Sequence, residues 1–262
     1  MKWAGNKIRL IEPIKTLLPQ GKRLIEPFMG SGAVFLNTDF KRYVLNDVNP
    51  DLIQLYKILQ NEGDDFIDYA ATFFQPKNNT RPRYQQLRKL FNNTKEPSKR
   101  SALFIYLNRH CYNGLCRYNK SGEFNVPFGL YKQPYFPALE MRAFYKKSKQ
   151  AKFICNDYQT VLTQCKQGDV VYCDPPYIPL STTANFTNYS GQHFHLDAQQ
   201  QLATLAEATA ARGIPVLLSN HDTPLSREYY KQAQLHSLQV RRFISCQGKG
   251  RQYVSELLAL FA

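Results

Sequence analysis

The tetrapeptide Asp174-Pro175-Pro176-Tyr177 carries residue types suited to chemistry on an amino group attached to a planar ring. It follows an apolar run that predicts a buried parallel strand, and ligands bind just past the carboxyl ends of such strands in open α/β sheets. The exocyclic nitrogen of adenine is a poor nucleophile because its lone pair is delocalised into the ring. A carboxylate and a proline carbonyl could each accept one N–H and return that lone pair to nitrogen.

In this hypothesis Asp174 and the Pro175 carbonyl activate the amino nitrogen, and Tyr177 stacks on the base. The alternative is that the Pro-Pro pair only ends the strand and that the flanking Asp and Tyr are loop residues. Since most Pro-Pro pairs do no more than this, the decision depends on the elements around the tetrapeptide.

A second motif, Glu26-Pro27-Phe28-Met29-Gly30-Ser31-Gly32, predicts a strand end, a glycine turn and a helix start. Glycines let backbone approach a ligand closely, and Ser31 lies where the helix begins. The third glycine of the dinucleotide fingerprint is missing. The next apolar strand ends at Asp47, whose carboxylate could accept hydrogen bonds from ribose hydroxyls. The order of these features predicts a nucleoside cofactor without a pyrophosphate.

The rest of the chain alternates strands and helices in the manner of α/β proteins. Strands are predicted at Leu24–Pro27, Tyr43–Asn46, Lys152–Cys155, Val170–Cys173 and Ile214–Ser219, and a C-terminal hairpin at Val240–Ser245 and Tyr253–Leu258 around the turn Gln247–Gly250. Helices are predicted at Lys7–Leu17, Ala33–Asn37, Pro50–Leu59 and Gln199–Ala211. Residues 57–136 lack the alternation: they are mostly helical to about Leu107 and loop-rich after it. We therefore expect a catalytic domain of residues 1–56 and 137–262 with an inserted domain of residues 57–136.

Charge points to a polyanionic partner. Lys and Arg outnumber Asp and Glu by 34 to 20, for a net charge of +14. Residues 81–135 hold eleven basic and two acidic residues, interleaved with aromatic ones. A solvated basic face over a small aromatic core would explain many of the aromatics, but not the scarcity of acids.

The six cysteines form no Cys-x-x-Cys pair and the five histidines no His-x-x-x-His pair. We expect reduced thiols, no disulfide and no metal, as in cytoplasmic proteins. Neither a signal peptide nor an apolar run long enough to span a bilayer is expected, and the chain should be a monomer in solution.

Three motifs, Lys2-Trp3-Ala4-Gly5-Asn6-Lys7, Glu26 to Gly32 and Asp174 to Tyr177, resemble in order motifs X, I and IV of the Dam-type DNA adenine-N6 methyltransferases of bacteria. The segments 107–129 and 219–222 resemble the same family, and the similarity runs from Lys2 to nearly the last residue. The resemblance implies a Rossmann-like class I methyltransferase sheet, the inserted mainly helical domain as the DNA target-recognition domain, and methyl transfer from S-adenosylmethionine to N6 of a flipped-out adenine. It also implies GATC as the target, S-adenosylhomocysteine as the product and no metal.

We expect the following positions around the cofactor, of which those of Trp3 and Lys7 are implied by the resemblance. Trp3 and Lys7 would close over the methionine end, the turn at Phe28 to Gly32 would lie near it, Asp47 would hold ribose, and Asp157 or Tyr158 would lie near adenine. The predicted cofactor-binding residues are Trp3, Lys7, Glu26, Phe28, Gly30, Ser31, Gly32, Asp47, Asp157, Tyr158 and Asp174.

Sequence reading is predicted in the segment Tyr112 to Pro127, a hairpin with two glycines that is thin enough for a major groove. Arg117 suits guanine, although it could contact phosphate instead, and Lys2, by resemblance, would read the other guanine. Leu115 and Pro127 would meet the thymine methyl or else form hairpin core, and Tyr112 would fill the space left by the extruded base. The predicted DNA-binding residues are Lys2, Arg88, Arg109, Tyr112, Asn113, Leu115, Arg117, Asn119, Asn125, Pro127, Tyr131 and Lys132, of which Arg88, Arg109, Lys132, Asn119 and Asn125 are candidates for phosphate contacts.

Three rival functions make different demands on the sequence. Cytosine-N4 methylation usually places Ser where Asp174 stands, and methylation of RNA or a protein amide usually places Asn there. A catalytically dead DNA-binding module would not need an intact cofactor turn. The sequence departs from the Dam-type pattern at Asn6, where Gly is common, and at Leu130, where a basic residue is expected; Leu130 puts one flanking phosphate contact in doubt.

Two further segments each allow two interpretations. His221 and Asp222 are either a catalytic dyad or, as we expect, a hydrogen-bonded loop pair. Residues 181–189 are either an ordinary surface loop or a segment that orders over the flipped base. The resemblance is compatible with marking a chromosome for mismatch repair and with service in a phage or a restriction system.

Overall fold

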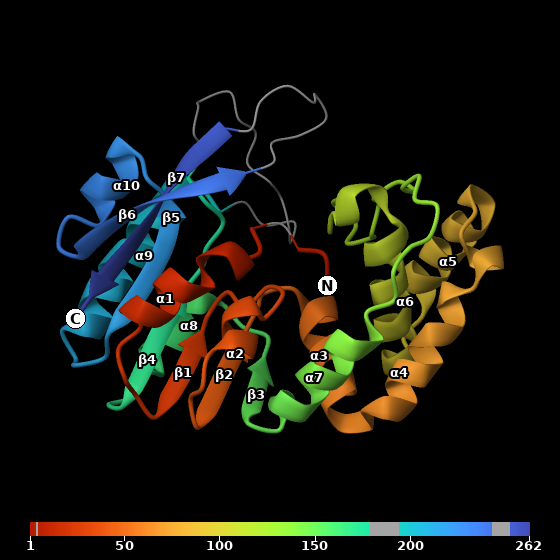
Figure 1. Ribbon diagram of the computed structural model, residues 1–262, viewed down its shortest axis with the longest axis horizontal. Helices are drawn as coiled ribbons and strands as arrows, with labels where there is room; N and C mark the ends of the chain where they lie inside the picture. The colour runs from red at the N-terminus through yellow and green to blue at the C-terminus, as the bar shows by residue number, and fades with distance from the viewer. Residues whose placement is uncertain (4, 179–193, 243–251) are drawn as a thin grey trace.

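The computed structural model describes residues 1–262 except 4, 179–193 and 243–251 (Figure 1). Its strands form one seven-stranded sheet with the order β3-β2-β1-β4-β5-β7-β6. Five strands run parallel: β1 (Arg23–Glu26), β2 (Arg42–Asn46), β3 (Ala151–Ile154), β4 (Asp169–Cys173) and β5 (Val216–His221). The C-terminal β7 (Gln252–Phe261) lies antiparallel between β5 and β6 (Gln234–Arg242). The fold is thus mixed α/β with a mostly parallel sheet.

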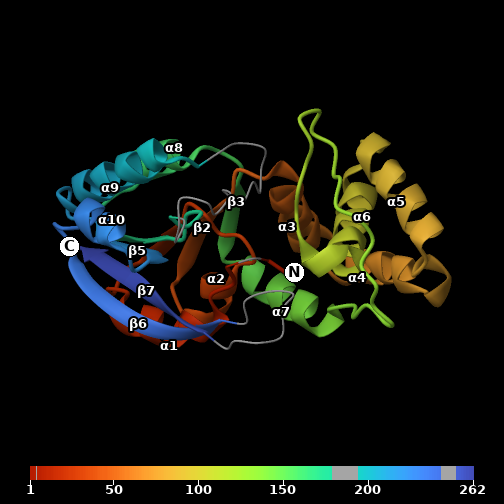
Figure 2. The same cartoon turned by 90° about the horizontal axis from the view of Figure 1, so that it is seen from above.

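Helices cover both faces of the sheet (Figure 2). One face carries α1 (Ile11–Leu17), which continues a 3-10 turn at Ile8–Leu10, together with α2 (Ala33–Asn37). The other carries α8 (Tyr158–Thr163), α9 (Leu196–Ala210) and α10 (Pro224–Tyr229). Helices α3 (Pro50–Glu62) and α7 (Ala138–Ser148) lie beyond β3.

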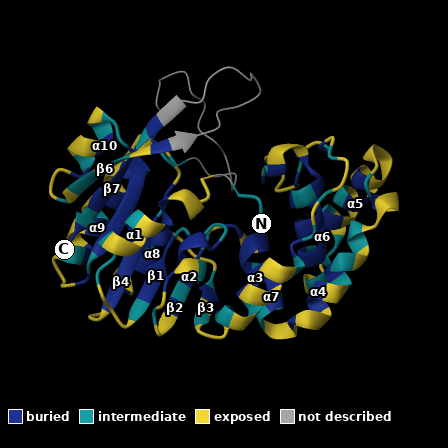
Figure 3. Ribbon diagram, in the orientation of Figure 1, coloured by how far each residue is buried: buried dark blue, intermediate teal, exposed yellow. Residues whose placement is uncertain are grey.

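The central strands are buried on both faces, as their near-continuous apolar sequences predict (Figure 3). Because successive side chains point to opposite faces, Val170 and Tyr172 of β4 join the core under α1 and α2, whereas Val171 and Cys173 join the core under α8 and α9. The sheet edge that follows these strands is therefore held from two sides.

The part of the chain between α3 and α7 is mainly helical and lies to one side of the sheet (Figure 1). It holds α4 (Asp64–Ala71), α5 (Arg81–Asn93), α6 (Pro97–His110) and the 3-10 turns Thr72–Phe74, Pro76–Asn78 and Tyr112–Gly114. Buried α6 packs against α3, α4 and α5. Helix α3 runs through position 57, so the sheet and this helical part share one rigid element.

Most predicted elements are confirmed, with two differences that matter. β5 extends to His221, so Asn220 and His221 belong to the strand and not to the loop after it. β6 begins at Gln234 rather than Val240, because this half-exposed edge strand carries alternate polar residues that weaken its apolar signal. The predicted turn at 247–250 and the segment 181–189 lie outside the described residues. No helix among the described residues is long and apolar enough to cross a membrane.

Candidate active site

The site lies at the switch point of the sheet, where β1 and β4 are neighbours although the chain leaves them toward opposite edges. Their pairing, with Ile25 opposite Val171, brings the glycine turn after β1 beside the tetrapeptide after β4. The two strongest motifs of the sequence, which lie more than a hundred residues apart, thus meet at the point of the sheet edge where open α/β sheets bind ligands in a crevice.

Asp174 is held by two side chains at this edge. The Lys7 ammonium lies 2.8 Å from its Oδ1, and the Ser219 hydroxyl donates to the same oxygen at 3.1 Å. The Lys7 side chain is 5% exposed and that of Asp174 21%, so the pair is largely withdrawn from water while the carboxylate stays accessible. Burial raises the pKa of Asp174, and the adjacent Lys7 opposes that rise. Asp174 is thereby a fixed, ion-paired proton acceptor facing the crevice.

Tyr177 is held by its hydroxyl and by packing against its ring. Its hydroxyl donates to Glu256 Oε2 of β7 at 2.8 Å, and the His221 ring packs edge-on with 4.8 Å between centroids. The Lys7 ammonium lies 4.5 Å from the ring centroid. The preceding Pro176 carbonyl accepts a hydrogen bond from Gln199, and Pro175 is buried. These contacts set the plane in which a base could stack.

The glycine turn needs its glycines. Gly30 and Gly32 have φ angles of +46° and +70°, which L side chains rarely adopt. A Cβ on Gly30 would lie 2.8 Å from Trp3 Nε1, so the indole packs directly on the turn. Tyr56, which the sequence analysis missed, donates to the Gly30 carbonyl at 2.8 Å. Half-buried Ser31 follows within the same turn.

Asp47 accepts two backbone hydrogen bonds, from Gly30 N–H at Oδ2 and from Asn49 N–H at Oδ1, both at 3.0 Å. Burial raises its pKa to about 6 although these bonds favour the charged form. Each carboxylate oxygen accepts more than one bond, so Asp47 keeps capacity for a ligand while it ties β2 to the turn.

Glu26 is 2% exposed, and its Oε1 has no hydrogen-bond partner among the residues that the structure describes. Burial, reinforced by the charge of Asp174, raises its pKa to about 8. A buried carboxyl oxygen without a donor is costly, so this atom marks a place where a donor of a ligand would be accommodated.

Aromatic rings border the crevice beside β1. Phe28 lies 5.3 Å from Tyr158 and 5.8 Å from Phe194, centroid to centroid. Tyr158 is buried, and exposed Asp157 caps α8 by accepting from Gln159 N–H at 2.7 Å. Both predicted residues are therefore parts of the local fold as well as candidates for contact with an adenine ring.

Residues 111–128 form a hairpin, which we call the recognition hairpin, with bridges Cys111 to Phe128 and Tyr118 to Phe124. Asn92 of α5 pairs with both backbone groups of Phe124, and the Tyr84 hydroxyl donates to the Val126 carbonyl at 2.8 Å. The hairpin shape predicted for this segment is confirmed, and its backbone is anchored to the helices behind it.

The side chains predicted to read bases differ in exposure. Tyr112, Arg117 and Pro127 are exposed, and Arg117 Nε donates to Asn125 Oδ1 at 2.8 Å. Asn113 is exposed with a φ of +53°. Half-buried Leu115 packs against the core, which favours the hairpin-core interpretation for this residue.

The candidate phosphate contacts are engaged to different degrees. Arg88 Nη1 donates to the Val126 carbonyl at 3.0 Å and Arg109 Nε to the Tyr135 carbonyl at 2.8 Å, so both support loops. Asn119 closes the hairpin turn by accepting from Ser121 and Glu123 N–H. Lys132 is exposed, and the Lys2 ammonium lies 4.0 Å from the centroid of the Tyr131 ring. Contact of these residues with DNA stays a prediction.

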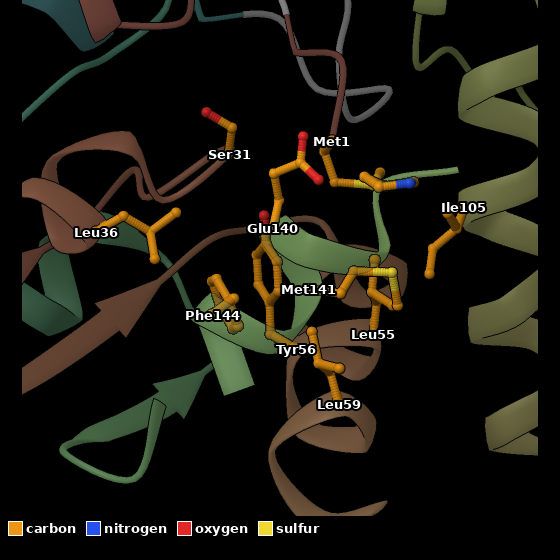
Figure 4. Close-up of a pocket in the computed structure, with 11 residues that line it drawn as sticks. Met1, Ser31, Leu36, Leu55, Tyr56, Leu59, Ile105, Glu140, Met141 and Phe144 are labelled. Atoms are coloured by element: carbon orange, nitrogen blue, oxygen red, sulfur yellow. The ribbon is translucent and has the colours of Figure 1, made fainter. Parts of the chain in front are cut away.

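A cavity of about 60 Å³ lies behind the glycine turn and not in the crevice (Figure 4). Ser31, Tyr56 and Phe144 line it together with Met1 and with Ile105 of α6. Its lining thus comes both from the glycine turn after β1 and from α6 of the helical part, next to the N-terminus.

The model of the D12 class N6 adenine-specific DNA methyltransferases matches residues 3–244. The chain belongs to this family. It is 52% identical to the DNA adenine methylases of Escherichia coli K12, Vibrio cholerae O1 and Serratia marcescens, over 100% of its own length and 94%, 95% and 97% of theirs. Because this family methylates N6 of adenine in DNA, membership in it excludes the rival functions of cytosine-N4 methylation and of methylation of RNA or protein.

In this D12 methyltransferase, His221 and Asp222 are not the loop pair that the sequence suggested. His221 ends β5 and its Nδ1 lies 2.7 Å from the Ile178 carbonyl, whereas Asp222 forms a two-point ion pair with Arg227 at 2.6 and 2.8 Å. The strand's extra two residues turn the side chains apart, so neither interpretation of the pair holds.

The sequence analysis also missed three residues that contact the predicted site residues: Glu256, Tyr56 and Phe194. Glu256 carried one signal, since it is the single acid in the apolar run 254–261 and must be buried there. No sequence signal marked Tyr56. It lies on an apolar helix face, and that pattern does not show that its hydroxyl bonds to a turn 26 residues away.

Proposed function

We propose that the protein transfers a methyl group from S-adenosylmethionine to N6 of a flipped-out adenine, with GATC in double-stranded DNA as its target. The observation that carries the proposal is the ion-paired carboxylate of Asp174 beside the ring of Tyr177, at the switch point that also holds the glycine turn. The full-length identity to DNA adenine methylases supports the choice of GATC.

Asp174 would accept a hydrogen bond from one N6–H of adenine, and the Pro175 carbonyl a hydrogen bond from the other. These two bonds would localise the lone pair on N6, which can then attack the methyl group. Lys7 keeps the Asp174 carboxylate charged and oriented, and Ser219 fixes the oxygen that Lys7 also holds. Tyr177 would stack on the extruded base, whose departure from the duplex costs a few kcal/mol. S-adenosylmethionine supplies an electrophilic methyl group on a sulfonium.

The residues around the turn fit this cofactor. Asp47 retains acceptor capacity for ribose, and the unpartnered Oε1 of Glu26 suits a hydrogen-bond donor such as an ammonium. Trp3 and Phe28 offer flat apolar surfaces on either side of the turn. Among the described residues, no group of three or more His, Cys, Asp or Glu side chains could hold a metal, and the absence of a metal stays a prediction.

The sheet with residues 1–56 and 137–262 would be a Rossmann-like class I methyltransferase domain, and residues 57–136 the DNA target-recognition domain. The anchored hairpin and the basic excess of residues 81–135 support this division. We further propose a monomer that acts in the bacterial cytoplasm, on the chromosome or, if phage-encoded, on DNA in the host.

Methyl transfer to defined substrates tests the proposal. Wild-type protein is incubated with cofactor labelled in its methyl group and with duplexes that contain GATC, GTTC or GATC already methylated on both strands. We expect label in N6-methyladenine from the first duplex only. Label in cytosine, or equal labelling of the first two duplexes, would overturn the substrate or the site.

A further inference from the structure

The first three residues touch both functional parts of the molecule. Figure 1 shows the N-terminus between the sheet and the helical insertion. Met1 lines the cavity of Figure 4 together with Ser31 from the glycine turn and Ile105 from α6. We call residues 1–3 the N-terminal segment.

Asn108 of α6 holds this segment by its backbone. Its side-chain Oδ1 accepts from Lys2 N–H at 2.9 Å, and its Nδ2 donates to the Lys2 carbonyl at 2.7 Å. The same Nδ2 lies 3.2 Å from the Gly114 carbonyl at the base of the recognition hairpin. Asn108 is 1% exposed, so water cannot replace these bonds at little cost. One buried amide therefore joins the segment to the hairpin.

Two glycines pack against the N-terminal segment, Gly114 against Lys2 and Gly30 against Trp3. A Cβ on Gly114 would lie 2.6 Å from Lys2 Cβ, and a Cβ on Gly30 would lie 2.8 Å from Trp3 Nε1. Lys2 thus lies against the hairpin and Trp3 against the cofactor turn. Because a single rigid peptide unit links the two residues, a shift of the Lys2 backbone also shifts the indole on Gly30.

We propose that Asn108 is a positioning residue that couples the DNA site to the cofactor site through the backbone of Lys2. DNA bound to the hairpin and to the Lys2 ammonium would stabilise the packing of Trp3 on the glycine turn. Bound cofactor would in return stabilise the position of the Lys2 backbone. This reciprocity is required of any two coupled binding sites. The inference rests on the proposed function for the identity of the two ligands.

The test measures the affinity for S-adenosylhomocysteine by calorimetry, with and without a saturating GATC duplex. Asn108→Leu, which removes all three bonds at similar volume, is compared with Asn92→Leu. Asn92 is a matched control because its amide also pairs with both backbone groups of one residue, Phe124, and anchors the same hairpin without touching the N-terminal segment. Circular dichroism verifies that both variants fold.

In the wild type, DNA should tighten the binding of S-adenosylhomocysteine by about fivefold or more. In Asn108→Leu, the ratio of the affinities for S-adenosylhomocysteine with and without DNA should fall close to one. Asn92→Leu should weaken DNA binding and leave this ratio as it is in the wild type. If Asn108→Leu does not fold, Asn108→Asp replaces it, since it retains the acceptor for Lys2 N–H but neither donation, and it should reduce the ratio in part. A wild-type ratio of one, or equal losses in the Asn108 and Asn92 variants, would overturn the inference.

A second readout separates positioning from general weakening. Asn108→Leu and Lys2→Ala should relax the choice of base at the same single position of the target, and the double variant should be no worse than either alone. Loss of discrimination spread over all positions would contradict the role of Lys2. Failure of the proposed function would instead show as wild-type protein that methylates no adenine, whatever the binding data give.

Discussion

The sheet edge and the recognition hairpin place their functional groups in opposite ways. At the edge, Asp174 and Asp47 are withdrawn from water and fixed by ion pairs or backbone N–H groups, and their pKa values are raised by burial. On the hairpin, Arg117 and Tyr112 are exposed, and the anchoring bonds hold the backbone behind them. In the proposed function, the chemistry therefore depends on side chains held by several bonds, and recognition of DNA on side chains exposed to solvent.

This contrast predicts that changes at the edge alter rate or cofactor affinity for every DNA sequence, whereas changes on the hairpin alter the choice among sequences. The largest effect should come from Asp174→Ala, which removes the proton acceptor and leaves Lys7 unpaired. We expect methyl transfer to fall by roughly 10²–10⁴-fold with DNA affinity within a few fold. Single-turnover rates on hemimethylated and unmodified duplexes measure the loss.

Ser219→Ala is the matched control, since it removes one hydrogen bond to the same oxygen and keeps the carboxylate. Its rate should lie between the wild type and Asp174→Ala. Near-normal turnover by the Asp174 variant would show that the carboxylate does not activate the amino group.

Next in size is the loss of the cofactor carboxylate. Asp47→Ala should weaken cofactor binding by about 1.5–3 kcal/mol, the value of a hydrogen bond to a charged group, without changing which DNA site is chosen. Calorimetric titration gives the affinity. Trp3→Ala, which uncovers the glycine turn, should act in the same direction; if both variants bind cofactor like the wild type, the cofactor lies elsewhere.

The hairpin gives the converse test. If Arg117 reads a guanine, Arg117→Ala should lose about 1–3 kcal/mol of discrimination at one base pair. Rates on GATC and on each of its single-base variants, for wild type and variant, provide the ranking of sites. Lys132→Ala is the control for a phosphate contact and should weaken all sequences alike. The same ranking before and after Arg117→Ala would assign that arginine to the backbone.

The two regions also differ in how far the sequence predicts them. Asp174 and the glycine turn were predictable because apolar strands fix where a following residue lies on the sheet edge. Partners across the fold were not: Glu256 reaches Tyr177 across 79 residues of sequence, and the pairing of β5 with β7 alone brings them together. The hairpin residues were assigned from the chemistry of their side chains, and Lys2 by resemblance. That chemistry left two targets open for Arg117, a guanine or a phosphate, because an exposed arginine carries no physical mark of its target.

A smaller effect should follow from the raised pKa of Asp47. With a pKa of about 6 in the free protein, its carboxyl is mostly neutral below that pH and a poorer acceptor for ribose hydroxyls. Cofactor affinity should therefore fall by about tenfold from pH 7 to pH 5. Glu26, whose pKa in the free protein is raised to about 8, would have to lose its proton to hold the cofactor ammonium, and this adds to the fall in affinity toward low pH. Asp47→Asn should therefore bind weakly and with a shallower pH profile than the wild type, and equal pH profiles of the two proteins would contradict the assignment of the tenfold change to Asp47.

The smallest effect concerns Leu130, which is 86% exposed at the base of the hairpin where a basic residue is expected. If the wild type neutralises about six phosphates, log K should fall against log salt with a slope of roughly −5. Leu130→Arg should steepen that slope by about 0.9 and tighten every sequence alike, because a phosphate contact carries no base information. Leu139→Arg is the control, since Leu139 is also an exposed leucine, at 75%, but lies on α7 and not on the hairpin. An equal change of slope in both variants would mean that the added charge acts through the net charge of the protein, and that position 130 does not face the DNA backbone.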